Sequence, residues 1–273
     1  MAASRSSKAK VPRTALVTGA SSGIGLCFAR RLAEDGYRLI LVARRAERLE
    51  ALAKEFGERY GAGFEVFPAD LTRPEELLAV EERIAGEPTF ELLVNNAGLG
   101  TAGRFAELDS AGEEAEIRLN VVAVTRLTRA ALPGMIERGK GAVINVSSMA
   151  GFAPSAYMAT YAATKAFVNA FTEALHDELS GTGVKVQALC PGFTRTEFQD
   201  VAGVDVDDLP GFVWQEPEAV VEASLDGLER GTLVLVPGLA NQALATLTSA
   251  LPRSWMRRVT AAAMRRSIDR REA

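Results

Sequence analysis

Histidine and cysteine are scarce in this chain. Its 273 residues include one histidine, His176, and two cysteines, Cys27 and Cys190. A single histidine excludes any site that needs several histidine ligands, and we predict no metal site. Both cysteines lie in apolar stretches, which favours two buried thiols over a disulfide.

Long apolar runs and a strong charge imbalance are also absent. No run approaches the roughly 20 residues that a membrane-spanning helix needs. The net charge of −4 gives no general reason to expect a nucleic-acid partner. Residues 1–12 are polar and basic and lack the apolar centre of a signal peptide. We therefore predict a disordered basic arm there, and a cytoplasmic protein.

Short apolar segments alternate with longer segments of helical period. Ala15–Val17 and Leu39–Val42 are apolar throughout, as in strands of a parallel sheet that is covered on both faces. Repeated strand–helix units predict an α/β fold, a doubly wound parallel sheet of about seven strands with helices on both faces. We expect strands at 14–18, 38–43, 64–68, 91–94, 142–147, 184–190 and 232–236, and helices at 23–36, 46–60, 74–85, 111–138, 155–180 and 217–230.

The predicted domain organisation is simple. After the arm, residues 13–238 form one α/β domain, in which residues 193–216 lack a regular period. Residues 239–273 form a helical extension, and its mostly apolar first part is a candidate lid over a pocket. Its last part is basic and partly amphipathic. Such a helix can contact an anionic membrane surface or an acidic partner, or dock on its own domain.

Tyr161 and Lys165 are four residues apart in a predicted helix and therefore share one face. A free tyrosine has a pKa of about 10, and a nearby ammonium favours its phenolate. We therefore expect Lys165 to lower the pKa of Tyr161. The pair could then exchange a proton with a carbonyl or alcohol oxygen that Ser148, thirteen residues earlier, can hold. Chemistry of this kind needs a redox partner.

A glycine-rich turn, Thr18–Gly25, follows the first predicted strand and opens the first predicted helix. Gly19, Gly23 and Gly25 would let backbone amides approach a pyrophosphate at the positive end of that helix. A glycine turn by itself is weak evidence, but this position between strand and helix predicts a dinucleotide site.

The end of the second predicted strand indicates which dinucleotide binds. Where a carboxylate would bind a ribose 2′-hydroxyl, this chain has Ala43, Arg44 and Arg45. A guanidinium can bind a 2′-phosphate, so we predict NADP(H) with Arg44 as the phosphate ligand. Arg45 is interpreted as the start of a solvated helix.

Two more loops follow predicted strands. Asp70 and Leu71 follow the third strand, where an adenine should lie, and Asn95–Gly98 end the fourth strand. Ligands of open sheets bind at the carboxyl ends of the strands, so these loops should converge on one crevice. Asn95 is a candidate for a purely structural role.

Together these segments resemble the short-chain dehydrogenase/reductase family in its single-domain branch. The resemblance spans Thr14 to Val236 and adds Asn120 and Pro191-Gly192 to the motifs above; the spacing of Gly19 and Gly23 matches this branch. It implies a Rossmann fold and a catalytic tetrad of Asn120, Ser148, Tyr161 and Lys165.

The resemblance also implies a role for each member of the tetrad. Tyr161 would exchange a proton with the substrate oxygen, which Ser148 would polarise. Lys165 would lower the pKa of Tyr161 and bind the nicotinamide ribose, and Asn120 would hold a water that links Lys165 to solvent. The cofactor residues so implied are Gly19, Ser21, Ser22, Gly23, Ile24, Gly25, Arg44, Asp70, Leu71, Asn96, Ala97, Gly98, Tyr161, Lys165, Pro191, Gly192, Thr194 and Thr196.

The predicted substrate pocket is apolar, which suits a hydrophobic carbonyl compound. The residues expected to line it are Ser148, Phe152, Tyr157, Phe193 and Phe198. The segments Tyr161–Val168 and Pro191–Phe198 are similar to a bacterial subgroup of the family that includes reductases of 3-oxoacyl lipids.

The leading hypothesis is therefore NADP(H)-dependent reduction of a 3-oxoacyl lipid or another long-chain ketone. A general reductase of small aldehydes and ketones is one alternative, and a non-catalytic NADP(H)-binding sensor is another. The resemblance further implies a homo-oligomer that forms through the two long helices at 111–138 and 155–180.

Overall fold

The computed structural model describes residues 13–61, 63–204 and 210–251, together with Ser254, Arg257, Arg258, Thr260, Ala261 and Arg265. The predicted basic arm at 1–12 and most of the predicted basic tail lie outside the described residues. Their assignment as an arm and as a membrane or partner contact stays a prediction.

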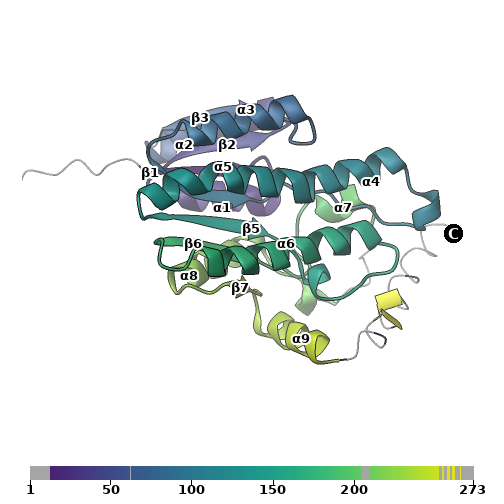
Figure 1. The fold of residues 1–273 in the computed structure, drawn as a ribbon. Coiled ribbons are helices and arrows are strands. Elements are labelled where there is room, and N and C mark those ends of the chain that lie inside the picture. The colour runs from purple at the N-terminus through teal and green to yellow at the C-terminus, as the bar shows by residue number, and fades with distance from the viewer. Residues whose placement is uncertain are drawn as a thin grey trace, which may run out of the picture.

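Seven strands form one parallel sheet in the order β3-β2-β1-β4-β5-β6-β7 (Figure 1). The strands are β1 (Arg13–Thr18), β2 (Tyr37–Ala43), β3 (Phe64–Pro68), β4 (Phe90–Asn95), β5 (Gly141–Val146), β6 (Val184–Leu189) and β7 (Val234–Leu235). This order confirms the predicted doubly wound sheet. Strands β1 to β3 are added toward one edge of the sheet, and strands from β4 onward are added toward the other edge. The switch lies between β1 and β4, and ligands of such sheets bind at this point.

Helices connect the strands and follow the last one. They are α1 (Gly23–Glu34), α2 (Ala46–Tyr60), α3 (Pro74–Ala85), α4 (Ser110–Ile117), α5 (Val124–Glu137), α6 (Ala159–Glu178), α7 (Phe198–Ala202), α8 (Pro217–Glu229) and α9 (Leu239–Ala250). A π-helical turn, Arg118–Ala123, joins α4 to α5 without a break. The single helix expected at 111–138 is therefore one rod with a local change of hydrogen bonding.

Helix α6 begins later than predicted. The helical period placed its start at Ser155, but the first helical residue is Ala159. Tyr157 has a φ of 64°, in the left-handed region, so a right-handed helix cannot include it. Its backbone oxygen instead accepts a hydrogen bond of 2.9 Å from the amide of Gly103.

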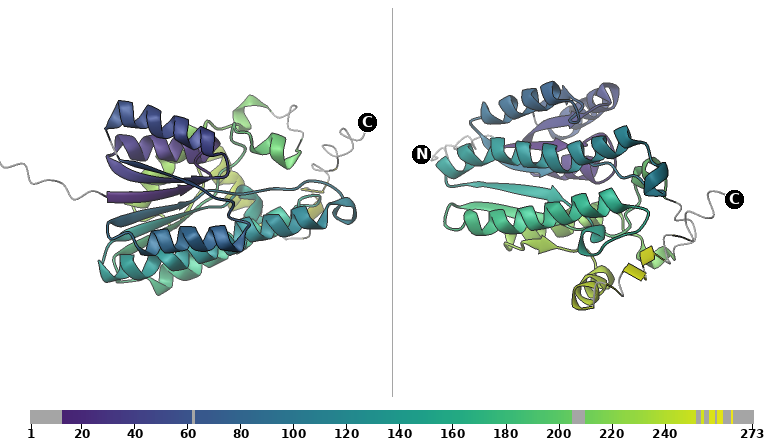
Figure 2. Two further views of the ribbon diagram at one scale, coloured as in Figure 1. Left: turned by 90° about the horizontal axis from the view of Figure 1, so that it is seen from above. Right: turned by 45° about the vertical axis from the view of Figure 1, so that its right-hand side comes forward.

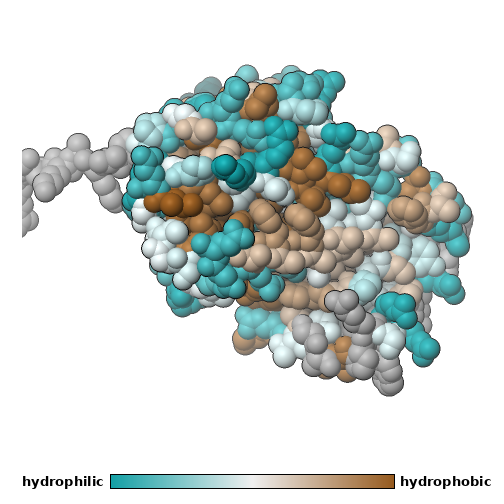
Figure 3. Space-filling view, in the orientation of Figure 1, coloured by the Kyte–Doolittle hydropathy of each residue, from teal (hydrophilic) through white to brown (hydrophobic). Residues whose placement is uncertain are grey.

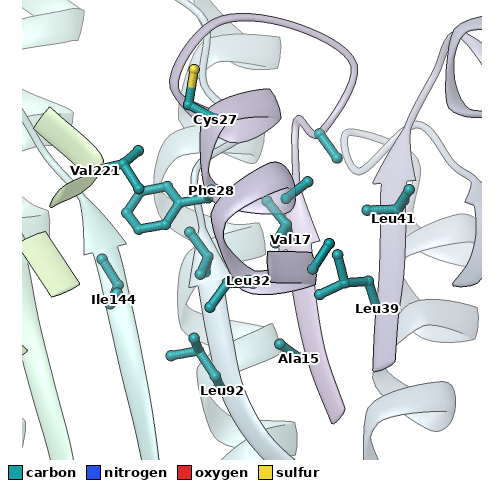
Figure 4. Packing of buried hydrophobic residues seen from close by; sticks show 14 of the residues in the cluster. Ala15, Val17, Cys27, Phe28, Leu32, Leu39, Leu41, Leu92, Ile144 and Val221 are labelled. Carbon is teal, nitrogen blue, oxygen red and sulfur yellow. The ribbon is translucent and has the colours of Figure 1, made fainter. Parts of the chain in front are cut away.

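Helices cover both faces of the sheet (Figure 2). Helices α1, α2 and α8 pack on one face, and α3, α5 and α6 pack on the other. Phe28 and Leu32 of α1 lie against Val17 of β1 and Leu92 of β4 (Figure 4). Burial of each such side chain contributes about 1.5–3 kcal/mol, and this packing holds the ends of the central strands in place.

Cys27 and Cys190 are buried free thiols, as predicted. Within the described residues, no group of histidine, cysteine, aspartate and glutamate side chains could hold a metal ion. No helix in the same part of the chain is long and apolar enough to cross a membrane.

The extension after β7 begins with α9, which packs beside the short turn Met149–Phe152. Ala245 of α9 belongs to a small apolar cluster with Val236, and Phe152 packs against that cluster. Near the start of α9, Asn241 lies against the backbone of Gly192. The extension is therefore packed on the domain next to the strand ends.

Candidate active site

A cleft opens at the carboxyl ends of the central strands. It is lined by the β1–α1 turn, the ends of β2 and β4, the start of α6, and the segments after β3, β5 and β6. All the predicted cofactor residues except Gly25 line it, although they come from distant parts of the sequence. The crevice expected from the strand ends is therefore present as one continuous site.

The glycine turn is held in a conformation that only glycine fits. Gly19 and Gly23 have φ values of 66° and 53°. A Cβ atom on Gly25 would lie 2.3 Å from the backbone oxygen of Gly19 and 2.4 Å from Nδ2 of Asn96. The amide of Asn96 donates to Oγ1 of Thr18, and its side chain donates to the Thr18 backbone oxygen, both at 2.9 Å. These residues therefore form a tight cradle at the start of α1 that fits a pyrophosphate.

Both arginines at the end of β2 line the cleft. Arg44, the predicted phosphate ligand, is exposed there. Arg45, interpreted as the start of a solvated helix, is the N-cap residue of α2, and it also donates to Oγ of Ser21 at 3.0 Å and to Oγ of Ser22 at 2.9 Å. Arg45 also ion-pairs with Glu197 at 2.8 Å. Sequence reasoning missed this second arginine because its partners lie far away in the chain.

Tyr161 and Lys165 lie on one face of α6, as their spacing predicted. Both side chains are buried, and Nζ of Lys165 is 5.6 Å from the centroid of the Tyr161 ring. Nζ donates to the backbone oxygen of Val146, the last residue of β5, at 2.9 Å. Ser148 follows β5, and its side chain lowers the pKa of the Tyr161 phenol. Ser147 instead donates to the backbone oxygen of Lys165 at 3.0 Å, which is a structural role.

Burial is the main influence on the protonation of this group. Burial raises the pKa of Tyr161 to about 12, while the hydrogen bond with Ser148 lowers it and the charge of Glu116 raises it further. Burial also lowers the pKa of Lys165 to about 8. Desolvation of the phenolate is the largest influence on the pKa of Tyr161 in this geometry, and the lowering effect expected from Lys165 stays a prediction. A protonated Tyr161 is an acid, which suits the reduction of a carbonyl.

Asn120 lies in the π-helical turn and is buried. Its side chain accepts a hydrogen bond from the amide of Leu99 at 3.0 Å, and donates to the backbone oxygen of Leu99 at 2.8 Å and to Thr164 at 3.1 Å. A Cβ atom on Gly98 would lie 3.3 Å from Oδ1 of Asn120 and 3.6 Å from Nζ of Lys165. The glycine thus keeps side-chain atoms out of the space between Asn120 and Lys165.

Asn95 has the structural role considered for it. Its side chain donates to Thr128 at 3.0 Å and to Asn145 of β5 at 2.9 Å, inside the core. Asn96, the next residue, faces the cleft. Adjacent strand-end residues point to opposite sides, so only one of the pair can reach a ligand.

The predicted substrate residues separate into two groups. Ser148 and Phe198 line the cleft, and the ring of Phe198 lies 5.3 Å from that of Tyr161. Three others do not line it. Phe152 packs against the cluster beside α9, Phe193 packs on Trp214 at 5.9 Å, and Tyr157 accepts a hydrogen bond of 3.3 Å from Arg265. Helix α9 does not line this cleft either, and its interpretation as a lid stays a prediction.

Comparison with known proteins agrees with this geometry. The family model for short chain dehydrogenases matches residues 13–205. The NADP-dependent 3-hydroxy acid dehydrogenase YdfG of Salmonella typhi is 40% identical over 219 residues, which cover 76% of this chain and 86% of that protein. The very-long-chain 3-oxoacyl-CoA reductase of Anas platyrhynchos is 34% identical over 232 residues, which cover 82% of this chain and 72% of that protein.

A solved structure is similar along most of its length. A short-chain dehydrogenase from Sphingobium yanoikuyae in complex with NADPH has a TM-score of 0.79 and 41% sequence identity, covering 88% of this chain and 97% of that one. Sheet order, glycine cradle and family match agree, and this chain belongs to the short-chain dehydrogenase/reductase family.

Proposed function

We propose that this protein is an NADP(H)-dependent oxidoreductase that reduces an apolar ketone, such as a 3-oxoacyl lipid, to the secondary alcohol. The observation that carries the proposal is that Ser148, Tyr161 and Lys165 lie in the same cleft as the glycine cradle. A proton donor and a dinucleotide site then face the same space, as carbonyl reduction requires.

Each residue has a defined task in this proposal. The bound cofactor supplies a hydride from its nicotinamide. Tyr161 donates a proton to the substrate oxygen, because burial keeps its phenol protonated at neutral pH. Ser148 holds the same oxygen, and Lys165, a buried cation beside the ring, stabilises the negative charge that Tyr161 acquires.

The cofactor preference is supported by Arg44 and Arg45, which both line the cleft, and Arg45 donates to the serines of the glycine turn. Two guanidinium groups suit the 2′-phosphate that distinguishes NADP(H) from NAD(H). The Salmonella typhi relative is NADP-dependent by name, and the Sphingobium yanoikuyae structure contains NADPH.

The choice of an apolar ketone is supported by the wall next to Tyr161, where Leu99, Phe198 and Val201 line the cleft. The name of the Anas platyrhynchos relative refers to very-long-chain 3-oxoacyl-CoA, which is a substrate of this kind. A general reductase of small aldehydes and ketones is the second candidate. It is favoured because Phe152 and Phe193 pack elsewhere and do not line the cleft. The cleft therefore has fewer apolar side chains than the sequence predicted.

The test is NADPH consumption with 3-oxoacyl thioesters of graded length, beside small ketones and aldehydes, with Tyr161→Phe as the blank. A kcat/KM that rises with chain length is the expected result. A flat or falling series would contradict the lipid substrate and favour the general reductase. Tight NADPH binding without turnover of any carbonyl would contradict the proposed reductase activity and favour a sensor.

We also infer that copies of this chain associate through α5 and α6. Apolar side chains gather on the face that these helices present (Figure 3). Ile136 of α5 and Phe167 of α6 are 43% and 39% exposed. Exposed apolar patches of this kind mark protein interfaces. Phe167→Glu should therefore lower the mass measured by light scattering, and an unchanged mass would contradict the interface.

A further inference from the structure

A second group of titratable side chains lies next to the catalytic residues. Glu113 and Glu116 of α4 are 8% and 0% exposed, so both carboxyl groups are buried. Thr101, from the loop after β4, contacts both of them. Thr160, one residue before Tyr161, donates a hydrogen bond to Glu113. Nothing in the proposed chemistry uses these two carboxyl groups.

The contacts of Thr101 point to a proton within this group. Its Oγ1 lies 2.5 Å from Oε1 of Glu113 and 2.7 Å from Oε2 of Glu116. A hydroxyl has one hydrogen, so it cannot donate a full hydrogen bond to both oxygens. A proton on one of the two carboxyl groups, donated to Thr101, gives each contact its own hydrogen.

Glu116 is the better carrier of that proton. Glu113 accepts from both Thr160 and Thr101, which stabilises its carboxylate. Oε1 of Glu116 is buried and has no hydrogen-bond partner among the described residues. An unpartnered oxygen costs much less on a neutral carboxylic acid than on a carboxylate. Burial raises the pKa of Glu116 to about 7; Thr101 lowers it and the charge of Glu113 raises it.

The charge of Glu116 acts on two residues of α6, the helix that carries Tyr161 and Lys165. Besides Glu113 on its own helix, the titratable groups that interact with it are Lys165 and Tyr161, both on α6. A carboxylate at Glu116 raises the pKa of both. Glu116 also lies one helical turn before Asn120, at the point where α4 passes into the π-helical turn.

We propose that Glu113 and Glu116 share one proton through Thr101, and that Glu116 is an electrostatic positioning residue whose carboxylate opposes ionisation of the Tyr161 phenol. Release of the shared proton to solvent converts the carboxylic acid to this carboxylate. The enzyme then retains its acid, and hence its ability to reduce a carbonyl, at a pH where it would otherwise lose it. This inference rests on the proposed function of Tyr161 as the proton donor.

The shared proton can be tested without any substrate. Infrared spectroscopy of the full-length protein should show a carboxylic acid C=O band that disappears as the pH rises through about 7, where the pKa of Glu116 lies. Glu116→Gln should remove the band. Glu113→Gln should move its midpoint to lower pH, because the like charge beside Glu116 is gone. A wild-type spectrum without a titrating band would overturn the proposal.

The coupling to Tyr161 is tested by the pH profile of NADPH-dependent reduction. Glu116→Gln cannot acquire charge, so the alkaline loss of activity should move to lower pH by on the order of one unit. Glu114→Gln is the matched control, since Glu114 lies on the same helix but forms an exposed ion pair with Arg118. An unmoved profile in a Glu116→Gln protein that still binds NADPH would overturn the proposal. Absence of turnover in the wild type would count against the proposed function instead, and the infrared result would stand.

Discussion

Arg45 and Glu197 form an ion pair of 2.8 Å across the mouth of the nucleotide cleft, although 152 residues separate them in sequence. Their side chains are 42% and 48% exposed. Arg48 binds the second oxygen of the same carboxylate at 2.8 Å. The segment after β6 is thereby tied to the start of α2, and one of the two arginines proposed to bind the 2′-phosphate already has an anionic partner.

Removing Arg45 should weaken NADPH more than NADH. A hydrogen bond to a charged group is worth about 1.5–3 kcal/mol, so Arg45→Gln should raise the Kd for NADPH roughly tenfold or more. The measurement is cofactor fluorescence in a binding titration. Arg48→Gln is the control, because Arg48 shares the Glu197 contact but does not line the cleft. Equal losses for NADPH and NADH would place the 2′-phosphate elsewhere.

Removing the carboxylate of Glu197 should have the opposite effect. In the proposed function a 2′-phosphate and Glu197 compete for Arg45, so Glu197→Gln should tighten NADPH and leave NADH unchanged. Hydrogen bonds from Arg48 and Arg45 hold the pKa of Glu197 at about 2, so the effect should be constant between about pH 5 and pH 8. Salt should reduce it, because the pair is exposed. Weaker NADPH binding would mean that Glu197 orders the arginines instead.

Tyr161→Phe should remove turnover but not cofactor binding. The substitution deletes the only proton donor proposed for the substrate oxygen, and general acid catalysis contributes about 10²–10⁴-fold. The aromatic ring and its packing against Phe198 are retained. Steady-state kinetics beside an NADPH titration separate the two effects. Activity within tenfold of the wild type would exclude Tyr161 as the acid.

Acid stability should depend on Glu87, whose carboxylate binds Arg38 and Arg83 at 2.8 Å each. Burial would raise its pKa, but hydrogen bonds from Arg83 and Thr89 and the charge of Arg38 lower it to about 2. Because the folded state holds this pKa below its ordinary value, the stabilisation is present above about pH 4.3 and disappears as the pH falls toward 2.

Glu87→Gln should therefore lower the free energy of unfolding by about 1–3 kcal/mol at pH 7, and by roughly half as much at pH 3, which lies between the folded and unfolded pKa values. Urea unfolding at both pH values measures this difference. Glu91→Gln is the control, because its partner Lys140 is largely exposed. An equal loss at both pH values would assign the effect to packing.

Local pattern predicted much of the fold and the centre of the site. Tyr161 and Lys165 share a face because the helical period is short and regular. The glycine turn can be recognised in the sequence because glycine alone tolerates its backbone geometry. The apolar residues of the irregular segments were predicted less well. Phe198 reaches the cleft whereas Phe193 packs on Trp214, and a segment without a period has no feature that separates the two.

The sequence by itself determined the alternation of strands and helices, the glycine turn and the face that carries Tyr161 and Lys165, because each depends on residues close together in the chain. Only the tertiary structure decided that Glu197 meets Arg45 and that Thr101 bridges Glu113 and Glu116. Those contacts join segments whose separation in the sequence carries no period. The burial that moves the pKa values of Tyr161 and Glu116 likewise exists only when the helices and the sheet enclose them.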